Sequence, residues 1–513
     1  MKLAESQLIT EIDSFAEAEL GIPTVELMRR AGAVVARVVR EHVEPGSEVI
    51  VLAGKGNNGG DGYAAAIKLI ADYRVLVYDV FAAEQSSSAG KHFLERYREL
   101  GGAIENYAPT QENLSKIKNT DCIIDAVFGT GFKGQMPDFV TEIAIAVCES
   151  VTAKKFAIDV PLGVNADNGS VHEHAVYAMA TIELSYIKPG MVSYPAKAYV
   201  GELVYDTLSL PLDKIEEKFE FKFELADESW ARSTLMPRED NSNKGTFGKL
   251  LTLVGSERYR GAARLALAAA LRSGVGLVNF LGTKAQNSEL LSDFPEVVYT
   301  DINPLSSFES ADALELAELS RKHSAILVGS GSSISDGLVS VIECLLSTEG
   351  SPVVLDADAI NSLSEKKGAL EIIRNSKRAV ILTPHPLEFA RLSGNDVSDV
   401  QLHRIEVARK FAAENRCILL LKGAATVVTD GDRVIINDSG SSALAKAGSG
   451  DVLAGLVGSL LAQGYAPLSA AALSAYLHGK AGDRLARKYS SYGVAPSDIP
   501  TAIAEYLGEL ENS

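Results

Sequence analysis

The sequence predicts two α/β domains, each built on a doubly wound sheet of mainly parallel strands. Three observations support this. Apolar runs of strand length are continuous, as expected for strands buried on both faces. Helical patterns lie between these runs, which is typical of βαβ units with right-handed crossovers. The alternation begins twice, on either side of a charged segment at 211–226, and 513 residues suffice for two such domains.

The first domain is assigned to residues 1–218. Its apolar runs predict strands at 48–53, 74–80, 121–126 and 156–160. A helical pattern at 89–100 separates the second strand from the third. Residues 212–225 alternate Lys and Glu around three Phe residues, so this segment is either a charged connection or an edge strand.

The second domain is assigned to residues 226–513. Its apolar runs predict strands at 249–255, 275–281, 325–329, 353–356, 379–383, 417–422, 425–429 and 434–436. The Asp430-Gly431-Asp432-Arg433 segment predicts a hairpin between the last two strands. Residues 452–477 carry no charge, but Gln463 to Pro467 interrupts them, so two packed helices are expected instead of a membrane span.

Composition limits the class of function. The 49 basic and 67 acidic residues give a net charge of −18 and a pI near 5.0, which argues against a nucleic-acid or anionic-membrane binder. Four cysteines without a CxxC pair indicate a reducing compartment and no zinc site. The first residues show no secretory signal, so a cytoplasmic protein is expected.

A glycine-rich segment, Gly54 to Gly62, follows the first predicted strand. Gly54, Gly56 and Gly59 fit the G-x-G-x-x-G fingerprint, with Asp79 at a suitable distance, although a tight strand-to-helix turn gives the same pattern. The segment also contains two amides and a carboxylate, which suit ribose or phosphate oxygens and a small cation.

Two further strand ends carry polar groups. Asp125 leads into the segment Phe128 to Gly134, and Asp159 leads into Val160 to Val164. The carboxyl ends of parallel strands meet at one edge of a sheet, so these segments are expected to share a ligand crevice. Alternatively, Asp159 is a helix-capping or turn residue.

These segments, together with Leu20-Gly21-Ile22-Pro23 and Leu27 to Gly32, resemble the NAD(P)HX epimerase domain of the YjeF N-terminal family. The resemblance implies a Rossmann-like fold that interconverts the R and S hydrates of NADH and NADPH. It implies a catalytic Asp159 in contact with the hydrated nicotinamide, and a potassium ion held by Asn58 and Asp125. Leu162 stands where the family usually has a serine ligand. The remaining implied substrate contacts are Asn57, Asn58, Gly59, Gly60, Asp61, Gly129, Thr130, Gly131, Phe132, Lys133, Gly134 and Gln135.

The second domain contains the motif Gly448-Ser449-Gly450-Asp451 before an apolar helix. The glycines let main-chain N–H groups converge on a phosphate at the positive end of the helix dipole. Asp451 could act as a base toward a hydroxyl that attacks the phosphoryl group. Asp is also among the best helix N-caps, which is the alternative.

Other polar groups precede this motif. Lys422 to Thr426 follows a buried strand and could contact a nucleotide or form a hairpin corner. His385 lies between two prolines, in a rigid loop, where a structural role is the alternative. Asp356 and Asp358 could serve Mg²⁺ or cap helices.

In this order, the motifs closely resemble the ADP-dependent NAD(P)H-hydrate dehydratase, which has a ribokinase-like fold. Ser333, Leu387 and Ser441 depart from the usual Gly, Gly and Asn. Both domains together resemble the bifunctional bacterial NAD(P)H-hydrate repair enzymes. The resemblance implies nucleotide contacts by Lys422, Gly423, Ala424, Ala425, Thr426 and Gly450, and contacts to the hydrated cofactor by Ala262, Gly331, His385 and Asp451.

The resemblance implies an enzyme that epimerises NADHX and NADPHX and dehydrates the S form with ADP, giving NAD(P)H, phosphate and AMP. Potassium in the first domain and Mg²⁺ with ADP in the second are the expected cofactors. A homo-oligomer is expected, without nucleic-acid or membrane partners. Two alternatives remain: a ribokinase-like small-molecule kinase, which would release a stable phosphorylated product, and a non-catalytic nucleotide-binding scaffold.

Overall fold

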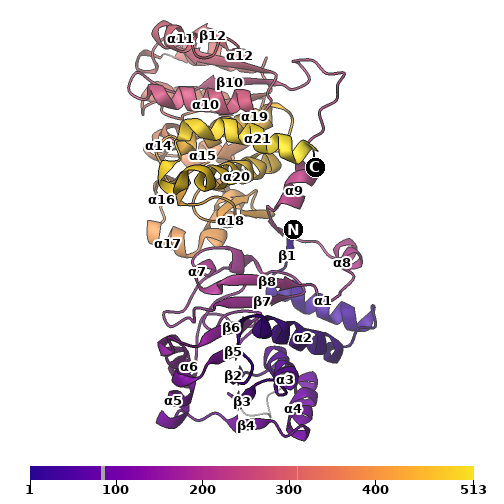
Figure 1. Cartoon of the computed structure of the whole chain (residues 1–513). Helices are drawn as coiled ribbons and strands as arrows, with labels where there is room; N and C mark the ends of the chain where they lie inside the picture. Colours follow the sequence, from indigo (N-terminus) through magenta and orange to yellow (C-terminus); the bar gives the residue numbers. More distant parts are fainter. Residues whose placement is uncertain (82–86, 309, 513) are drawn as a thin grey trace. The chain divides into compact units, whose positions relative to one another are not determined.

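The computed structural model describes residues 1–81, 87–308 and 310–512. Its contacts divide the chain into two compact units, Lys2–Phe223 and Glu224–Ser513, the latter joined by Met1. In each unit, helices cover a central sheet, as Figure 1 shows.

The first unit contains a parallel sheet in the order β4-β3-β2-β5-β6-β7-β8. The four predicted strands are present. The other three were missed because β4 is an exposed edge, β8 is half-exposed, and β7 carries a charged residue, Glu183. The strands are β2 (Glu48–Ala53), β3 (Arg74–Asp79), β4 (Ala103–Asn106), β5 (Cys122–Ala126), β6 (Lys154–Ile158), β7 (Ala180–Leu184) and β8 (Glu202–Asp206).

Apolar clusters lie on both faces of this sheet. Val49 and Val51 of β2 belong to a cluster with α1 to α4, whereas Ile50 and Leu52 belong to a second cluster with α5 and α6. Burial on both faces explains the continuous apolar runs. The remaining elements are β1 (Lys2–Leu3), α1 (Ser6–Ala18), α2 (Thr24–His42), α3 (Asn57–Leu69), α4 (Ser88–Glu99), α5 (Gln111–Asn119), α6 (Asp138–Glu149), η2 (Pro189–Val192), α7 (Lys197–Val200) and α8 (Leu212–Lys218).

The sheet of the second unit contains the order β9-β18-β17-β16-β15-β14-β13-β10-β11-β12. In this spatial order, the strands from β16 to the end at β12 pair in parallel, whereas β17 pairs antiparallel with both β16 and β18. The antiparallel pair of β17 and β18 confirms the predicted hairpin. The strands are β9 (Phe223–Leu225), β10 (Lys249–Leu253), β11 (Leu277–Gly282), β12 (Val298–Asp301), β13 (Ala325–Val328), β14 (Val353–Leu355), β15 (Val380–Leu382), β16 (Ile418–Leu421), β17 (Thr426–Thr429) and β18 (Val434–Asn437).

The uncharged stretch forms two helices, α19 (Ser449–Ala462) and α20 (Pro467–Gly493), as predicted. They pack with α10 (Arg260–Arg272) and α21 (Ile499–Asn512). Within the described residues, no helix is long and apolar enough to cross a membrane. The other helices are α9 (Glu228–Thr234), α11 (Lys284–Leu290), η3 (Leu305–Ser307), α12 (Ser310–Ser320), α13 (Asp336–Ser347), α14 (Asp358–Ser364), α15 (Ala369–Arg374), α16 (Pro386–Ser393), α17 (Val397–Leu402), α18 (Arg404–Asn415), η4 (Ser442–Leu444) and η5 (Pro496–Asp498).

The close contact of α19 with α10 predicts a large effect of a single methyl group. A Cβ at Gly455 would lie 2.2 Å from the carbonyl oxygen of Ala266, so Gly455→Ala forces the helices apart and should lower the free energy of unfolding by about 1–3 kcal/mol. Gly508→Ala, in α21 with no atom within 4 Å of its Cβ, should be neutral or stabilising. Calorimetry of both variants measures this, and equal melting temperatures would contradict it.

Candidate functional site

A cavity of about 740 Å³ lies in the first unit, where the segments after β2, β5 and β6 meet. Gly59, Gly60 and Gly134 are not among its lining residues, although the resemblance implied that they contact substrate. The predicted site residues that line the cavity are Asn57, Asn58, Asp61, Gly129, Thr130, Gly131, Phe132, Lys133, Gln135 and Asp159.

The glycine-rich segment differs from the expected loop. Helix α3 begins at Asn57, so most of the segment forms its first turns. Of the glycines at 54–62, only Gly56 has a left-handed φ, at 84°. A Cβ at Gly59 would lie 1.9 Å from the carbonyl oxygen of Gly54, so this glycine permits close packing of α3 on the strand end. The packing places Asn57, Asn58 and Asp61 at the cavity wall.

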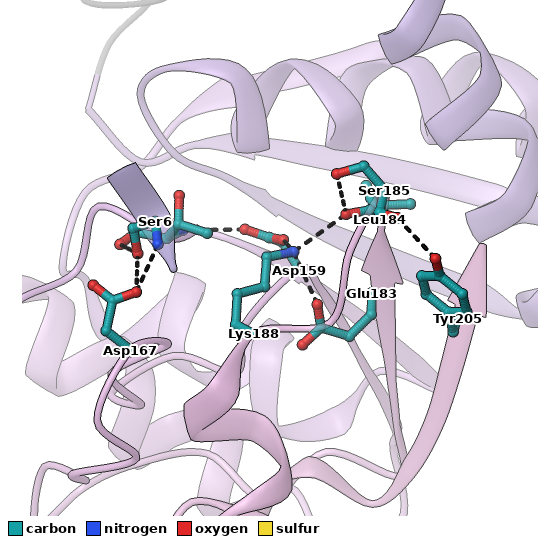
Figure 2. Close-up of polar contacts among 9 residues, drawn as sticks. Ser6, Asp159, Asp167, Glu183, Leu184, Ser185, Lys188 and Tyr205 are labelled. Carbon is teal, nitrogen blue, oxygen red and sulfur yellow. Dashed lines mark hydrogen bonds and ion pairs between the residues drawn. The ribbon is translucent and has the colours of Figure 1, made fainter. Parts of the chain in front are cut away.

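Asp159 is the centre of a polar network at the end of β6. It adopts a left-handed φ of 68°, unusual for a non-glycine residue, and its carboxylate holds it there. Its Oδ2 accepts from the main-chain N–H of Thr130 at 3.1 Å, and its Oδ1 pairs with the ammonium of Lys188. Lys188 also donates to Glu183 Oε2 at 2.8 Å, so it bridges two carboxylates (Figure 2).

Carboxylates outnumber ammonium groups in this network. Burial lowers the pKa of Lys188, but Asp159 and Glu183 raise it more, so its ammonium stays charged. Burial raises the pKa of Glu183 to about 8, that of Asp13 to about 6, and that of Asp61 well above its ordinary range. Protonated and ionised carboxyl groups therefore lie side by side near neutral pH.

Sequence reasoning missed Asp13, Glu183 and Lys188. The available signal was a charged residue within the apolar run 180–184, followed by a lysine just beyond the strand. Asp13 lies on α1, far from the motifs in sequence, and only the fold brings it to the cavity wall.

The loop after β5 is fixed by a second cluster. The main-chain N–H and the hydroxyl of Ser6 both donate to Asp167 Oδ1 at 2.7 Å, and the same hydroxyl donates to the carbonyl of Thr130 at 2.9 Å. Lys133 donates to Asp167 Oδ2 at 2.8 Å. Figure 2 shows Ser6 and Asp167 beside Asp159, so the two clusters hold this loop together.

The predicted potassium residues are buried. Both side-chain polar atoms of Asn58 find no hydrogen-bond partner among the described residues. Asp125 accepts from the main-chain N–H groups of Leu162 and Val127, at 2.6 Å and 3.2 Å. Burial raises the pKa of Asp125 to about 7, and these two bonds oppose the rise. The Leu162 side chain packs in the apolar cluster behind the sheet.

A cavity of about 480 Å³ in the second unit brings together three predicted substrate contacts: Ala262, Gly331 and Asp451. A Cβ at Gly331, where φ is 64°, would lie 2.5 Å from that of Ala262, so the glycine allows these segments to meet. Asp358 and Gly448 also line this cavity.

The phosphate motif forms the start of α19. Gly448 precedes the helix with a left-handed φ of 99°. Among the described residues, the main-chain N–H groups of Gly450 and Asp451 have no acceptor, whereas those of Ser449 and Val452 do. Two free donors at a helix N-terminus form an anion site.

Lys422 reaches this motif from the turn after β16. Its ammonium donates to Asp356 Oδ1 at 2.9 Å and would lie 3.4 Å from a Cβ at Gly450. The carboxylate of Asp356 also accepts hydrogen bonds from the hydroxyl groups of Thr383 and Ser330, so it connects both residues to Lys422.

The turn itself, with Gly423, Ala424, Ala425 and Thr426, joins the antiparallel strands β16 and β17, so it is a hairpin corner as well as a candidate nucleotide loop. Burial raises the pKa of Asp451 to about 7; Asp356 and Asp358 add to this rise, and Lys422 opposes it.

His385 is not among the residues lining this cavity. Its Nδ1 accepts from the main-chain N–H groups of Leu387 and Glu388, both at 3.2 Å, and so caps α16. The helix-capping role considered as the alternative is therefore present, and contact of His385 with the hydrated cofactor stays a prediction. Asp358, whose carboxylate accepts from the N–H of Ser333 at 2.9 Å, is the cavity residue beside Asp451.

Comparison with known proteins agrees with both resemblances. Residues 250–505 match the family model of NAD(P)H-hydrate dehydratase, and residues 24–190 match that of the YjeF-related protein N-terminus. The bifunctional NAD(P)H-hydrate repair enzyme Nnr of Moorella thermoacetica is 33% identical, over 100% of this chain and 97% of that protein.

Solved structures resemble the second unit. A ribokinase-like superfamily protein from Enterococcus faecalis V583 is 22% identical, with a TM-score of 0.50 over 57% of this chain and 99% of that one, which confirms the ribokinase-like fold. The ADP/ATP-dependent NAD(P)H-hydrate dehydratase from Bacillus subtilis, co-crystallised with ATP/Mg²⁺, is 29% identical over 56% of this chain and 99% of that one, with a TM-score of 0.49. The full-length match, with a family model in each unit, shows that this chain belongs to the bifunctional NAD(P)H-hydrate repair enzymes.

Proposed function

We propose that the chain repairs hydrated NADH and NADPH in two steps. The first unit interconverts R- and S-NAD(P)HX, and the second dehydrates the S form at the expense of ADP, giving NAD(P)H, phosphate and AMP. The match to bifunctional relatives along the whole chain carries this proposal. A cavity with acid–base groups in each unit supports it.

Dehydration requires a good leaving group at C6 of the hydrated ring. Asp451 takes the proton of the C6 hydroxyl, whose oxygen attacks the β-phosphorus of ADP while the bond to AMP breaks. The free N–H groups of Gly450 and Asp451 donate to the phosphoryl oxygens. The phosphate then leaves with the C6–O electron pair as C5 loses a proton, which restores the C5=C6 double bond.

The turn Lys422 to Thr426 would hold the nucleotide. The ammonium of the partly buried Lys422 lies beside the phosphate motif and would supply positive charge to the phosphates. Mg²⁺ on the phosphate oxygens would neutralise charge that develops during transfer. Asp358 and Asp451, the two carboxylates of the cavity wall, are the residues that would face it.

Epimerisation requires that the C6–O bond breaks and reforms on the opposite face of the ring. C6 is bonded to the ring nitrogen, so a carboxylic acid that protonates the departing hydroxyl leaves an iminium to which water can add. Asp61 and Asp13, with their raised pKa values, supply the acid. Asp159, paired with Lys188, takes the proton of the incoming water.

Asn58 and Asp125 would hold potassium in the first unit. Among the residues that the structure describes, the buried amide oxygen of Asn58 has no partner and the buried Asp125 carboxylate has no paired cation, so both fit an oxygen-preferring ion. A bound potassium ion would supply positive charge near the phosphate-rich substrate.

Four free cysteines support a cytoplasmic location. The homo-oligomer stays a prediction.

Purified R and S hydrates test the two steps separately. We expect the S hydrate with ADP to regain reduced-nicotinamide absorbance and to release AMP and phosphate in equal amounts. The R hydrate should react at a rate set by the first unit. A stable phosphorylated product would indicate a kinase instead, and binding without turnover would indicate a scaffold.

Replacement of Asp451 by Asn tests the dehydratase mechanism. The amide keeps the size but cannot accept the proton, so dehydration should fall by ~10²-fold or more while epimerase activity stays unchanged. Because the pKa of Asp451 is about 7 and its ionised form is the base, wild-type turnover should rise with pH toward a plateau above pH 7. Near-normal turnover of the variant would exclude this base.

Replacement of Asn58 by Ala tests the potassium site. Loss of its amide oxygen should weaken potassium binding, so the ion concentration for half-maximal epimerase activity should rise about tenfold, with dehydration unaffected. Asp159→Asn keeps the ion ligands, and should lose epimerase activity at every potassium concentration. Superimposable potassium titrations of wild type and Asn58→Ala would place the ion elsewhere.

A further inference from the structure

Arg404 is a buried cation without an anionic partner. It is the first residue of α18 and is 2% exposed. Within the described part of the chain, no carboxylate lies at ion-pair distance, and its Nε has no hydrogen-bond acceptor. Burial lowers its pKa to about 10, which still leaves the guanidinium charged at neutral pH.

The guanidinium lies against the candidate nucleotide turn. Its Nη2 donates to the main-chain carbonyls of Leu421 and Lys422, both at 3.0 Å, and its Nη1 donates to Gln401 at 3.1 Å. A Cβ at Gly423 would lie 2.8 Å from Nη2, so only a glycine leaves room for this contact.

These bonds connect Arg404 to the phosphate motif through one residue. The main-chain carbonyl of Lys422 accepts a hydrogen bond from Arg404. The ammonium of Lys422 donates to Asp356 and lies beside Gly450. Fixing the main chain of Lys422 therefore fixes where its charge is presented. A buried charge without a partner is unfavourable, so an anionic ligand that supplies the missing charge would be favoured.

We propose that Arg404 is a positioning residue for the adenine nucleotide: it holds the turn that carries Lys422 and adds a positive charge beneath it that the phosphates complement. This inference rests on the proposed function, because it takes the ligand of the turn to be ADP. It adds a residue from α18 to a site otherwise formed by the strand ends and α19.

Arg404→Met removes the charge and both carbonyl bonds, and Arg404→Lys keeps the charge but cannot reproduce the planar fork. We expect the KM for ADP with Mg²⁺ to rise at least about tenfold in the Met variant and less in the Lys variant. The KM for the S hydrate and the epimerase activity should stay within twofold of wild type. The thermal stabilisation by ADP with Mg²⁺ should shrink in the same order.

Arg378 provides a matched control. It is also buried and bonds to the oxygens of Thr348, Ser320 and Ser351, with no carboxylate partner in the described ranges of the chain. It precedes β15, however, and so lies at the opposite sheet edge from the turn. Arg378→Met should lower the melting temperature without a change in the KM for ADP.

The outcomes separate the two levels of inference. A wild type that needs no adenine nucleotide would overturn the proposed function. If the wild type needs ADP but the Arg404 variants bind ADP as tightly as the wild type does, only the positioning role of Arg404 is overturned. If the Met variant does not fold, the Lys variant decides: an unchanged KM for ADP refutes the proposal, and a selective rise supports it.

Discussion

Both candidate sites depend on main chains that approach one another more closely than any side chain would allow. In the first unit, α3 lies on the end of β2 because Gly59 has no Cβ, and the end of β2 lies against the main chain of Val127 because Gly54 has none. In the second, α19 touches α10 at Gly455, which positions the helix start that carries the phosphate motif. The N-terminus of each helix is therefore positioned by the packing of the rest of that helix. Its polar groups have their orientation before any ligand binds.

In each unit, a lysine that is buried or partly buried faces several carboxylates. Lys188 bridges Asp159 and Glu183, and Lys422 pairs with Asp356 near Asp451. Burial raises the pKa of the surrounding carboxyl groups, and one positive charge does not offset this for all of them, so some keep a proton near neutral pH. This is how one site can hold an acid and a base built from the same residue type.

Much of the fold was predictable because strands buried on both faces give continuous apolar runs. Edge strands such as β4 and β12 give no such signal, since their exposed faces tolerate polar residues. Glycine spacing pointed to Asp451, because it reflects backbone geometry, and the ends of apolar runs pointed to Asp159 and Lys422. Their partners Asp13, Glu183 and Arg404 were missed. Asp13 reaches its site from α1, far from the motifs in sequence, and no local pattern marks Arg404. Glu183 does carry a signal, a charge within an apolar run, but that signal does not show which residues it contacts.

The division of the chain into two compact units, each with its own core and cavity, has a consequence for the cell. Two separately encoded enzymes would vary in their ratio with transcription, translation and turnover. A single polypeptide fixes that ratio at one to one under every condition of expression. Supply of the S hydrate and its consumption therefore scale together. A shortage of the epimerase relative to the dehydratase, or the reverse, does not arise, so it cannot cause either epimer to accumulate.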